Sequence, residues 1–437
     1  MKPGRLFISE FEAEERLRKA DSFSLPSLSL FRKRDELLLD GMDALAVTMA
    51  DKGDTVITRI PLSEAYLRWW NDTFSEIRNC SPKPCDEAGP DGRETIYRLL
   101  ERDPAMHGLL RENRIVNYAV TKDCYDLCES LSLKVMEPSL SVIEMLSRKS
   151  WSNELRRRFG FSPYGVSVSS IEEFDICIQE MLVNYGRVLI KDSMGVSGRG
   201  IVPADSLKTA QRISLHFRKQ REEGKKNFDF VIEPYLNKTM DFSCQLRIAP
   251  DGEIRIDGYR KNTGKGFGYR SSSALSEAEL KLIFASGYRE DVMKIAGAMA
   301  EAGYFGYACI DSMIADESTV IPLLEINPRM SMGRFSLSLE NRCGKHCLLS
   351  FAEGTASAEV TADMVLSDLE ASGLLYSKTR SRGIVPLAPS AWDRKKCAGN
   401  RVRIYYAVVY DSEEDYETVL DSWLGYCARR ICTGPVT

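Results

Sequence analysis

Two apolar stretches, far apart in the chain, carry the polar side chains that most restrict how this sequence can fold. Residues 187–200 read RVLIKDSMGVSGRG, so an apolar segment delivers Lys191 and then gives way to a loop of glycine and serine. Residues 323–329 read LLEINPR, with Glu325 and Asn327 two positions apart. Side chains alternate across a β-strand, so these two point to one face. We expect the fold to bring a lysine and a glycine loop opposite an acid and an amide.

The polar groups of both stretches suit a magnesium ion and a polyphosphate. Magnesium prefers hard oxygen ligands and keeps several waters, and Asp311, Glu325 and the amide oxygen of Asn327 offer such oxygens. The Lys191 ammonium neutralises phosphate charge, and glycines in the next loop let backbone N–H groups approach phosphate oxygens. This loop is not a P-loop, because the pattern G-x-x-x-x-G-K-[ST] occurs nowhere in the chain.

Composition and charge exclude several classes of partner. The chain has 437 residues, 43% hydrophobic and 28% charged, which suits a globular protein with two or three cores. The net charge is −4 and no basic block is long enough to follow a phosphate backbone, so we expect no nucleic-acid partner. There is no apolar run of about eighteen residues and no signal-peptide pattern at residues 1–5, which predicts no membrane partner and a cytoplasmic location.

The order of the expected elements is that of an α/β (α+β) protein. Residues 114–120, a helix, and residues 133–136 have the β-α-β rhythm of a small parallel-sheet domain. A helix that begins near Lys149 follows, and a glycine after Phe159 can end it. A second expected helix, 171–185, precedes the Lys191 strand.

The second half of the chain begins with a predicted hairpin. Strands over 242–248 and 253–259 flank an Asp-Gly turn, which supplies the positive φ angle of a tight turn. The glycine-rich segment 261–270 is expected to be a lid or substrate loop, with a plain connector as the alternative. Near the end, a strand over 401–410 and a helix over 413–430 form one β-α unit.

Taken in order, these residues resemble the ATP-grasp superfamily, in particular its carboxylate–amine ligases, over residues 145 to about 335. Segment 233–236, which reads EPYL, is similar to the hinge that binds adenine, and Asp241 falls where the superfamily usually has a ribose-binding glutamate. Arg329 matches the arginine that contacts the acyl phosphate. The resemblance and the glycine loop together give the candidate nucleotide-binding residues Lys149, Lys191, Ser197, Gly198, Glu233, Tyr235, Leu236 and Asp241, and the candidate magnesium ligands Asp311, Glu325 and Asn327.

The resemblance implies an ATP-grasp fold, with a small N-terminal parallel-sheet domain and two α+β subdomains that clamp ATP. We place an N-terminal domain at 1–145, the central subdomain at 146–236, and the C-terminal subdomain with the metal site and a terminal β-α extension at 237–437. It also implies ATP with one or two Mg²⁺ ions, for which Mn²⁺ could substitute.

The activity implied is an ADP-forming ligase, in which ATP converts a small carboxylic acid, an amino acid in the first instance, into an acyl phosphate that an amine then attacks. Two alternatives stay open: a kinase or phosphotransferase on the same scaffold, and a non-catalytic protein that binds ATP as a regulator. The partners expected are small carboxylate and amine substrates, and a homodimer is compatible with this class.

Substrate residues are harder to choose from the sequence. Arg247 alternates with Gln245 on its strand and could reach the site, which makes it a second catalytic candidate beside Arg329. Residues 330–334 follow the expected strand that carries Glu325 and Asn327, which we call the metal strand. The candidate substrate residues are therefore Ser331, Gly333 and Arg334. Arg334 would recognise a substrate carboxylate, and a salt-bridge role is the equal alternative.

Overall fold

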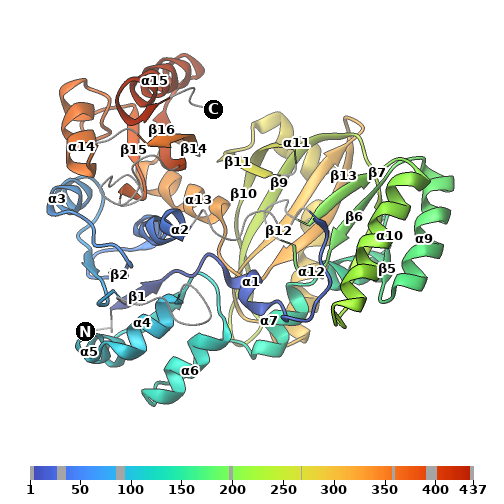
Figure 1. The fold of residues 1–437 in the computed structure, drawn as a ribbon. Coiled ribbons are helices and arrows are strands. Elements are labelled where there is room, and N and C mark those ends of the chain that lie inside the picture. Colours follow the sequence, from blue (N-terminus) through green and yellow to red (C-terminus); the bar gives the residue numbers. More distant parts are fainter. Residues whose placement is uncertain are drawn as a thin grey trace.

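A small parallel sheet forms the N-terminal part of the protein. The computed structural model describes residues 4–26, 36–84, 94–195, 200–266, 268–356, 360–389 and 401–433. The sheet has the order β3-β2-β1-β4 (Figure 1). Its strands are β1 (Arg5–Ile8), β2 (Thr55–Ile57), β3 (Arg78–Cys80) and β4 (Arg114–Asn117), and its helices include α2 (Glu36–Met42), α3 (Glu64–Thr73), α4 (Ile96–Arg102), α5 (Pro104–Glu112), α6 (Lys122–Ser130) and α7 (Leu140–Leu146).

One strand expected in this sheet does not form. Residues 133–136 are irregular, so the predicted second strand of the β-α-β unit is wrong. Val135 and Met136 are each 43% exposed, and an added strand with these side chains would bury little apolar surface. The edge next to β1 is completed by the earlier strands β2 and β3 instead.

Helix α8 (Lys149–Phe159) leads from the N-terminal part into the central subdomain. It begins at Lys149 and ends at Gly160, whose φ of 73° lies in the left-handed region that a glycine adopts without strain. Both ends of the predicted helix are therefore confirmed. Its first turn lies beside β13 (Thr319–Asn327), where Ile326 N–H donates to Ser152 Oγ.

The central subdomain is an antiparallel four-stranded sheet under two helices. The strand order is β5-β8-β6-β7, from β5 (Val166–Val168), β6 (Val188–Asp192), β7 (Ile201–Ala204) and β8 (Phe230–Pro234). Helices α9 (Ile171–Tyr185) and α10 (Leu207–Glu222) lie on its outer face, as Figure 1 shows. The helix predicted over 171–185 is thus confirmed as α9. Phe174, Phe217 and Phe230 are fully buried between the helices and the sheet.

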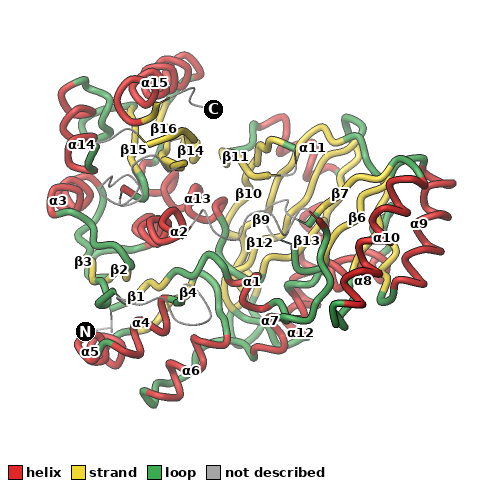
Figure 2. Tube along the Cα trace, viewed as in Figure 1, coloured by secondary structure: helices red, strands yellow, loops and turns green. Residues whose placement is uncertain are grey.

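A nine-stranded sheet forms the rest of the molecule. Its order is β13-β12-β9-β10-β11-β14-β16-β15, with β17 paired to β14. In Figure 2, β9, β10, β12 and β13 cross the middle of the view, and β14, β15 and β16 lie at the upper left. The strands are β9 (Lys238–Ile248), β10 (Ile254–Lys265), β11 (Gly268–Ser273), β12 (Gly306–Ala315), β13, β14 (His346–Ala356), β15 (Gly383–Pro386), β16 (Arg401–Tyr410) and β17 (Cys432–Thr433). The helices packed on it include α11 (Glu277–Ala285), α12 (Tyr288–Glu301), α13 (Met332–Cys343), α14 (Ala362–Ala371) and α15 (Glu413–Tyr426).

In the glycine-rich segment 261–270, residues 261–265 and 268–270 are strand residues of this sheet rather than a lid. Strand β10 continues through Lys265 and pairs with β11, with an irregularity in register near Gly264. A side chain on Gly264 would lie 2.7 Å from the carbonyl oxygen of Gly268, so the close approach of two strands explains this glycine. The expectation of a lid or substrate loop at 261–270 is therefore wrong.

Two hydrophobic cores join the N-terminal part to the large sheet. In one of them Phe7 and Trp70 share a cluster with Tyr405 and Trp423, near the other end of the chain. In the other, Leu6 shares a cluster with residues of β9 and β12. These cores cross the predicted boundary at residue 145, while the boundaries themselves stay predictions.

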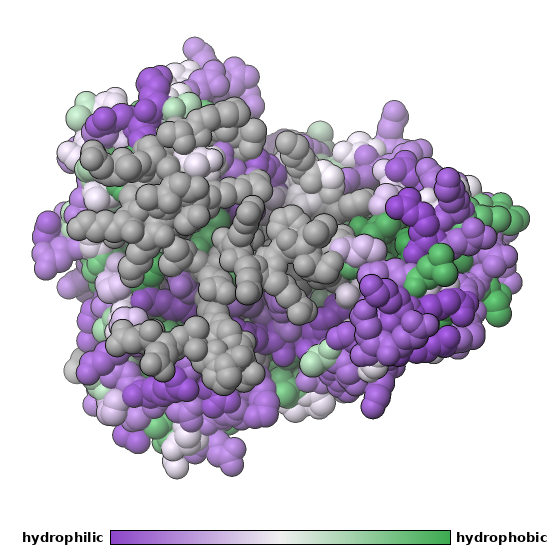
Figure 3. All heavy atoms as spheres, in the orientation of Figure 1, coloured by the Kyte–Doolittle hydropathy of each residue, from purple (hydrophilic) through white to green (hydrophobic). Residues whose placement is uncertain are grey.

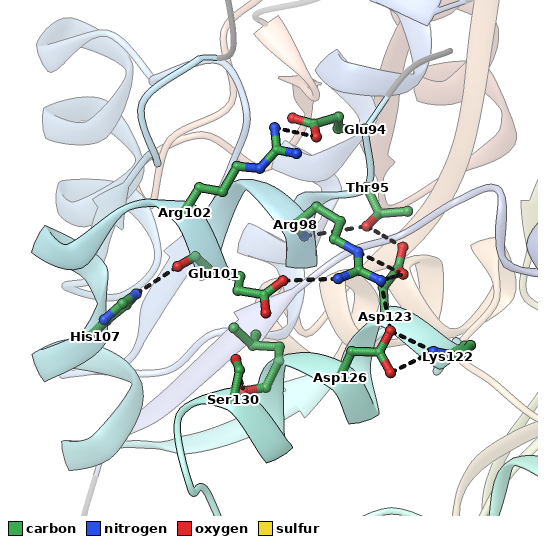
Figure 4. Close-up of polar contacts among 11 residues, drawn as sticks. Glu94, Thr95, Arg98, Glu101, Arg102, His107, Lys122, Asp123, Asp126 and Ser130 are labelled. Carbon is green, nitrogen blue, oxygen red and sulfur yellow. Dashed lines mark hydrogen bonds and ion pairs between the residues drawn. The ribbon is translucent and has the colours of Figure 1, made fainter. Parts of the chain in front are cut away.

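Surface groups between α4 and α6 form a polar network that fixes these helices to one another. Arg98 pairs with Asp123 at 2.9 Å and with Asp126 at 2.7 Å (Figure 4). Each of these side chains is partly exposed, so we expect the network to contribute little to stability. It lies outside the candidate active site.

Most of the described surface in Figure 3 is hydrophilic, with apolar patches at the α9–α10 end of the molecule. There Ile176 and Val183 of α9 and Leu215 of α10 are more than half exposed.

Among the described residues, no helix combines the length and the apolar character that crossing a bilayer requires.

Candidate active site

The three predicted metal ligands come together on β12 and β13. These strands pair antiparallel, with Asp311 directly opposite Glu325 and Cys309 opposite Asn327. The Asn327 amide donates to Asp311 Oδ2 at 2.7 Å. Opposite positions on paired strands have their Cβ atoms about 4.5–5.5 Å apart, so the two carboxylates share one small region of the sheet face.

The pKa values of the two acids move in opposite directions. Burial and the charge of Glu325 raise the pKa of Asp311 to about 7. Burial would also raise the pKa of Glu325, but the ion pair with Lys149 holds it below its usual value. Arg329 lowers the pKa of Asp311 only in part, and Asp311 forms no ion pair among the described residues, so a metal ion would supply the missing positive charge.

Two carboxylates and an amide fit a magnesium ion. Among the described residues, no cluster of three or more His, Cys, Asp or Glu side chains is arranged to hold a metal. Magnesium does not require such a cage, because it binds one or two carboxylates and completes its shell with water and phosphate oxygens. Asp311, Glu325 and the Asn327 side-chain oxygen are the residues that would hold it.

Lys149 connects the metal strands to the central subdomain. Its ammonium lies 2.7 Å from Glu325 Oε2 and donates to the carbonyl oxygen of Gly195 at 2.6 Å. Burial by itself would lower the pKa of Lys149, but the Glu325 carboxylate raises it. The amine therefore stays charged, between the acid on β13 and the start of the glycine loop.

Lys191 and Glu233, both predicted to bind the nucleotide, contact one another. The Lys191 ammonium lies 2.6 Å from Glu233 Oε2, and Arg156 Nη1 of α8 lies 2.9 Å from Glu233 Oε1. Burial raises the pKa of Glu233, but these two cations bring it below its usual value. Lys191 also lowers the pKa of Glu325, so the two lysines and the two glutamates form one connected charge cluster.

The predicted hinge and ribose residues lie at the junction of β8 and β9. The Tyr235 N–H donates to the Arg187 carbonyl oxygen at 3.0 Å, and the Arg187 guanidinium lies 3.8 Å from the Tyr235 ring centroid. Leu236 packs against the small apolar cluster of Met313, Ala315 and Ile321. Asp241 pairs with Lys238 at 2.5 Å and contributes to the raised pKa of Asp311.

Two predicted residues of the glycine loop, Ser197 and Gly198, lie outside the described residues. The loop is described up to Gly195, whose carbonyl oxygen accepts from Lys149. The nucleotide-binding roles of Ser197 and Gly198 stay predictions.

Arg329 follows the metal strand and is held by several groups. Its Nη1 donates to the Tyr118 hydroxyl at 3.1 Å and to the Met330 carbonyl oxygen at 3.0 Å, and its Nη2 donates to Asn327 Oδ1 at 3.1 Å. Its Nε donates to Glu14. Burial works against the guanidinium charge, whereas Glu14 raises the pKa of Arg329. A largely buried, permanent cation therefore lies next to Asn327, one of the predicted metal ligands.

A cavity brings these groups together. Its lining includes both metal-strand and central-subdomain residues, namely Glu14, Ser147, Lys149, Met194, Gly195, Glu325, Ile326, Asn327, Pro328 and Arg329. A second cavity lies beside it, along the segment that follows Glu14. Glu325, Asn327 and Lys149 thus line one cavity, whereas Lys191 and Asp311 do not line it. The predicted meeting of Lys191 with Glu325 in one cleft stays a prediction.

The predicted substrate residues have partners inside the protein. Arg334 is buried, with Nη1 2.6 Å from Asp257 Oδ2 and its guanidinium 4.9 Å from the Tyr307 ring centroid. Its charge is balanced without a ligand, as in the salt-bridge alternative. A substrate role for Arg334 stays a prediction that would require Asp257 to be displaced.

Ser331, Gly333 and Arg247 are placed differently. Ser331 caps α13 and donates to Gln245 Oε1 at 2.8 Å. A Cβ atom on Gly333 would lie 2.7 Å from Gln245 Nε2, so Gly333 permits this contact. Arg247 is exposed on β9, two positions beyond Gln245 on the same strand face. None of the three lines the cavity described above.

Several residues of the site carried no signal in the sequence. Glu14 and Arg18 come from the short helix α1 (Ala13–Leu17) and the residue after it, and Arg156 from the middle of α8. Cys309, fully buried beside Asp311 and Gln245, is another. Each acts through a contact with a residue distant in the chain, which a local pattern cannot reveal.

No family model matches this chain. It is similar to the butirosin acyl-carrier protein–L-glutamate ligase of Niallia circulans, 24% identical over 213 residues, which are 47% of this chain and 48% of that protein. The chain thus spans about half the length of the curated relative it matches.

Solved structures resemble nearly the whole chain. One is N5-carboxyaminoimidazole synthetase of Staphylococcus aureus complexed with ADP, with a TM-score of 0.52, 14% identity and coverage of 97% of both chains. Another is the biotin carboxylase domain dimer of Hydrogenobacter thermophilus 2-oxoglutarate carboxylase in complex with MgADP, with a TM-score of 0.57, 11% identity and coverage of 100% of this chain and 92% of that one. The chain has the ATP-grasp fold, and the predicted fold class is confirmed.

Proposed function

We propose that this protein is an ATP-dependent ligase that activates a small carboxylic acid, an amino acid, as an acyl phosphate and joins it to an amine. ADP and phosphate are the other products. ATP lies between the central sheet and the nine-stranded sheet, and one or two Mg²⁺ ions are held by Asp311, Glu325 and Asn327. Arg247 stays a catalytic candidate, and Ser331, Gly333 and Arg334 stay candidate substrate residues.

The observation that carries this proposal is the shared cavity of Lys149, Glu325, Asn327 and Arg329. A phosphotransfer site needs cations for the phosphates and hard oxygen ligands for a metal, and both are present within one ion-paired cluster. A protein that binds ATP as a regulator alone has no need of a buried arginine beside the metal ligands.

In the first step a carboxylate oxygen of the acid attacks the γ-phosphorus. The bond between the γ-phosphorus and the β,γ-bridging oxygen breaks, ADP leaves, and the acid becomes an acyl phosphate. Lys149 and Lys191 hold the phosphate oxygens, and Arg329 holds the acid opposite them. Asp311, Glu325 and Asn327 would hold magnesium, which would offset the charge of the phosphates.

In the second step the amine nitrogen attacks the acyl carbon. The carbonyl oxygen becomes negative, then the carbon–oxygen bond to phosphate breaks, and phosphate leaves as the nitrogen loses a proton. Arg329 supports this step because a permanent cation stabilises the developing oxyanion and the departing phosphate. No protein nucleophile is needed.

The relative from Niallia circulans guides the choice of substrates. Its name couples L-glutamate to an acyl-carrier protein. L-Glutamate is therefore the first acid to test. Free amines are the first acceptors to test, followed by an amine attached to an acyl-carrier protein. A homodimer stays a prediction, to be checked by light scattering on the purified chain.

The experiment uses the full chain with ATP, Mg²⁺ and single amino acids whose carboxylates carry ¹⁸O. Hydroxylamine serves as a general acceptor because it converts acyl phosphates to hydroxamates. We expect acid-dependent phosphate release, a hydroxamate of the matching mass, and one ¹⁸O atom in the released phosphate. The ¹⁸O transfer reports the acyl phosphate directly.

The alternatives give different results in the same assay. A kinase would yield a stable phosphorylated product, without hydroxamate. A binding-only protein would bind ATP, measured by calorimetry, without phosphate release from any mixture. Either result overturns the proposed ligase.

A further inference from the structure

A segment near the N-terminus passes through the candidate active site. We call residues 12–25 the strap. It leaves the parallel sheet after β1, forms α1, and runs onto the central subdomain, so that α1 lies between the N-terminal sheet and the two other sheets (Figure 1). The strap therefore contacts parts of the molecule on both sides of the cavity.

The far end of the strap is anchored in the core of the central subdomain. Phe23 is 4% exposed and Leu25 is fully buried, in one cluster with Phe217 and Phe228. The Phe23 ring lies edge-on to Phe228, with centroids 5.1 Å apart. Ser24 N–H donates to Gln220 Oε1 at 2.8 Å. This end moves with the central subdomain.

The middle of the strap is tied to the strand that carries the phosphate-binding lysine. Arg18 pairs with Asp192 at 2.9 Å, and Asp192 directly follows Lys191. Both side chains are almost completely buried, with 11% and 3% exposure. The ion pair therefore joins the strap to the start of the glycine loop.

The near end places a carboxylate on Arg329. Glu14 accepts from Arg329 Nε, and the other hydrogen bonds of this guanidinium go to the neutral groups of Tyr118, Asn327 and Met330. Among the residues that the structure describes, Glu14 is the one acid in contact with this cation. The guanidinium charge is thus already balanced before any substrate is bound.

We propose that Glu14 is a positioning residue that competes with the acid substrate for Arg329. This rests on the proposed function, in which Arg329 binds the carboxylate and its acyl phosphate. The guanidinium edge at Nε holds one anion at a time, so the incoming acid has to displace the Glu14 carboxylate. The strap therefore sets the affinity for the acid.

Displacement of Glu14 also has a mechanical consequence. Because the strap is fixed to the central subdomain through Arg18 and Phe23, α1 cannot leave Arg329 without acting on the segment that holds Lys191. Arrival of the acid is thereby linked to the position of the phosphate-binding strand. An acid that binds Arg329 weakly leaves the strap in place.

The test compares Glu14→Gln with wild type. The variant keeps a hydrogen-bonding oxygen and removes the competing charge, so the half-saturating L-glutamate concentration should fall about tenfold, the loss of one charge-assisted hydrogen bond. The maximal rate and the ATP affinity should change much less. Glu154→Gln on α8, which breaks an exposed pair with Arg157, is the charge-matched control.

A merely structural role for Glu14 would lower the melting temperature and the maximal rate together. An unchanged or raised half-saturating concentration in a folded Glu14→Gln protein would overturn the proposal. Glu14→Asp keeps the charge but shortens the side chain, so it should also lower the half-saturating L-glutamate concentration. It serves as the second variant if Glu14→Gln fails to fold.

A second arm requires no turnover. Inorganic phosphate is titrated into protein loaded with ADP and Mg²⁺, and its affinity should be about tenfold higher in Glu14→Gln than in wild type. Equal phosphate affinity would overturn the competition. If no acid is turned over but this difference is found, the proposed ligase fails while the role of Glu14 at Arg329 stands.

Discussion

Replacing Glu233 by glutamine removes one negative charge from a buried site that holds two cations. Glu233 is 6% exposed and contacts Lys191 at 2.6 Å and Arg156 at 2.9 Å. Removing one member of a buried pair costs about 3–5 kcal/mol, because the remaining charge stays without compensation. With about 2.1 cal/mol/K of unfolding entropy per residue, a chain of 437 residues shifts by about 1 °C per kcal/mol, so this loss lowers the melting temperature by about 3–5 °C.

The same charge argument makes the variant respond more strongly to nucleotide. A bound triphosphate places negative charge next to Lys191, so MgATP should raise the melting temperature of Glu233→Gln more than that of wild type. Scanning calorimetry with and without MgATP measures both effects. The double variant Arg156→Met/Glu233→Gln has one buried cation fewer and should regain part of the loss.

Two results would refute this reasoning. A melting temperature within about 1 °C of wild type would mean that the pairs contribute less than about 1 kcal/mol. A double variant less stable than Glu233→Gln would mean that packing, not charge, dominates. If Glu233→Gln instead lost affinity for ATP but not for GTP, and its stability were unchanged, the adenine-hinge role predicted from the sequence would be supported.

Three further predictions concern the metal strands. Because the pKa of Asp311 is raised to about 7, a metal ion has to displace a proton below that pH, so MgADP affinity should rise as pH increases from 6 to 8; calorimetry that finds no pH dependence would contradict this. Asp311→Asn should abolish phosphate release without lowering the melting temperature, since it relieves the repulsion with Glu325, and near wild-type turnover would show the metal assignment to be wrong. Arg329→Ala should lower turnover far more than ATP affinity, and equal losses in both would move Arg329 to the nucleotide site.

The sequence predicted those features that depend on local chemistry. The start of α8 at Lys149, the glycine that ends it, and the turn between β9 and β10 follow from capping and turn preferences. The sequence allowed the pairing of Asp311 with Glu325 to be predicted, because each residue lies on a strongly apolar strand. The order of the elements also limits which strands can be neighbours. Because side chains alternate along a strand, Glu325 and Asn327 were then expected on the same face of the sheet.

Other features depend on contacts between residues far apart in the chain. Nothing near Glu233 in the sequence shows that its carboxylate meets Arg156 rather than a ligand. Glu14 lies in a charged stretch that is ordinary for an exposed helix, and its role comes from the path of the strap. The segments 133–136 and 261–270 were misassigned because strand pairing, not local composition, decides which short extended segments join a sheet.

The balance of charge in the site has a consequence for metal stoichiometry. Each of the cations Lys149, Lys191, Arg156 and Arg329 contacts an acid, and the acids of the site are Glu325, Glu233, Asp311 and Glu14. With Asp311 ionised, these eight side chains carry no net charge. ATP with two magnesium ions is also neutral, whereas ATP with one carries an excess of two negative charges into a buried region. Burying unbalanced charge is costly. We therefore predict that the nucleotide binds with two metal ions and that the second ion replaces the proton on Asp311, so that titration of the ADP-loaded protein with Mg²⁺ releases a proton below pH 7.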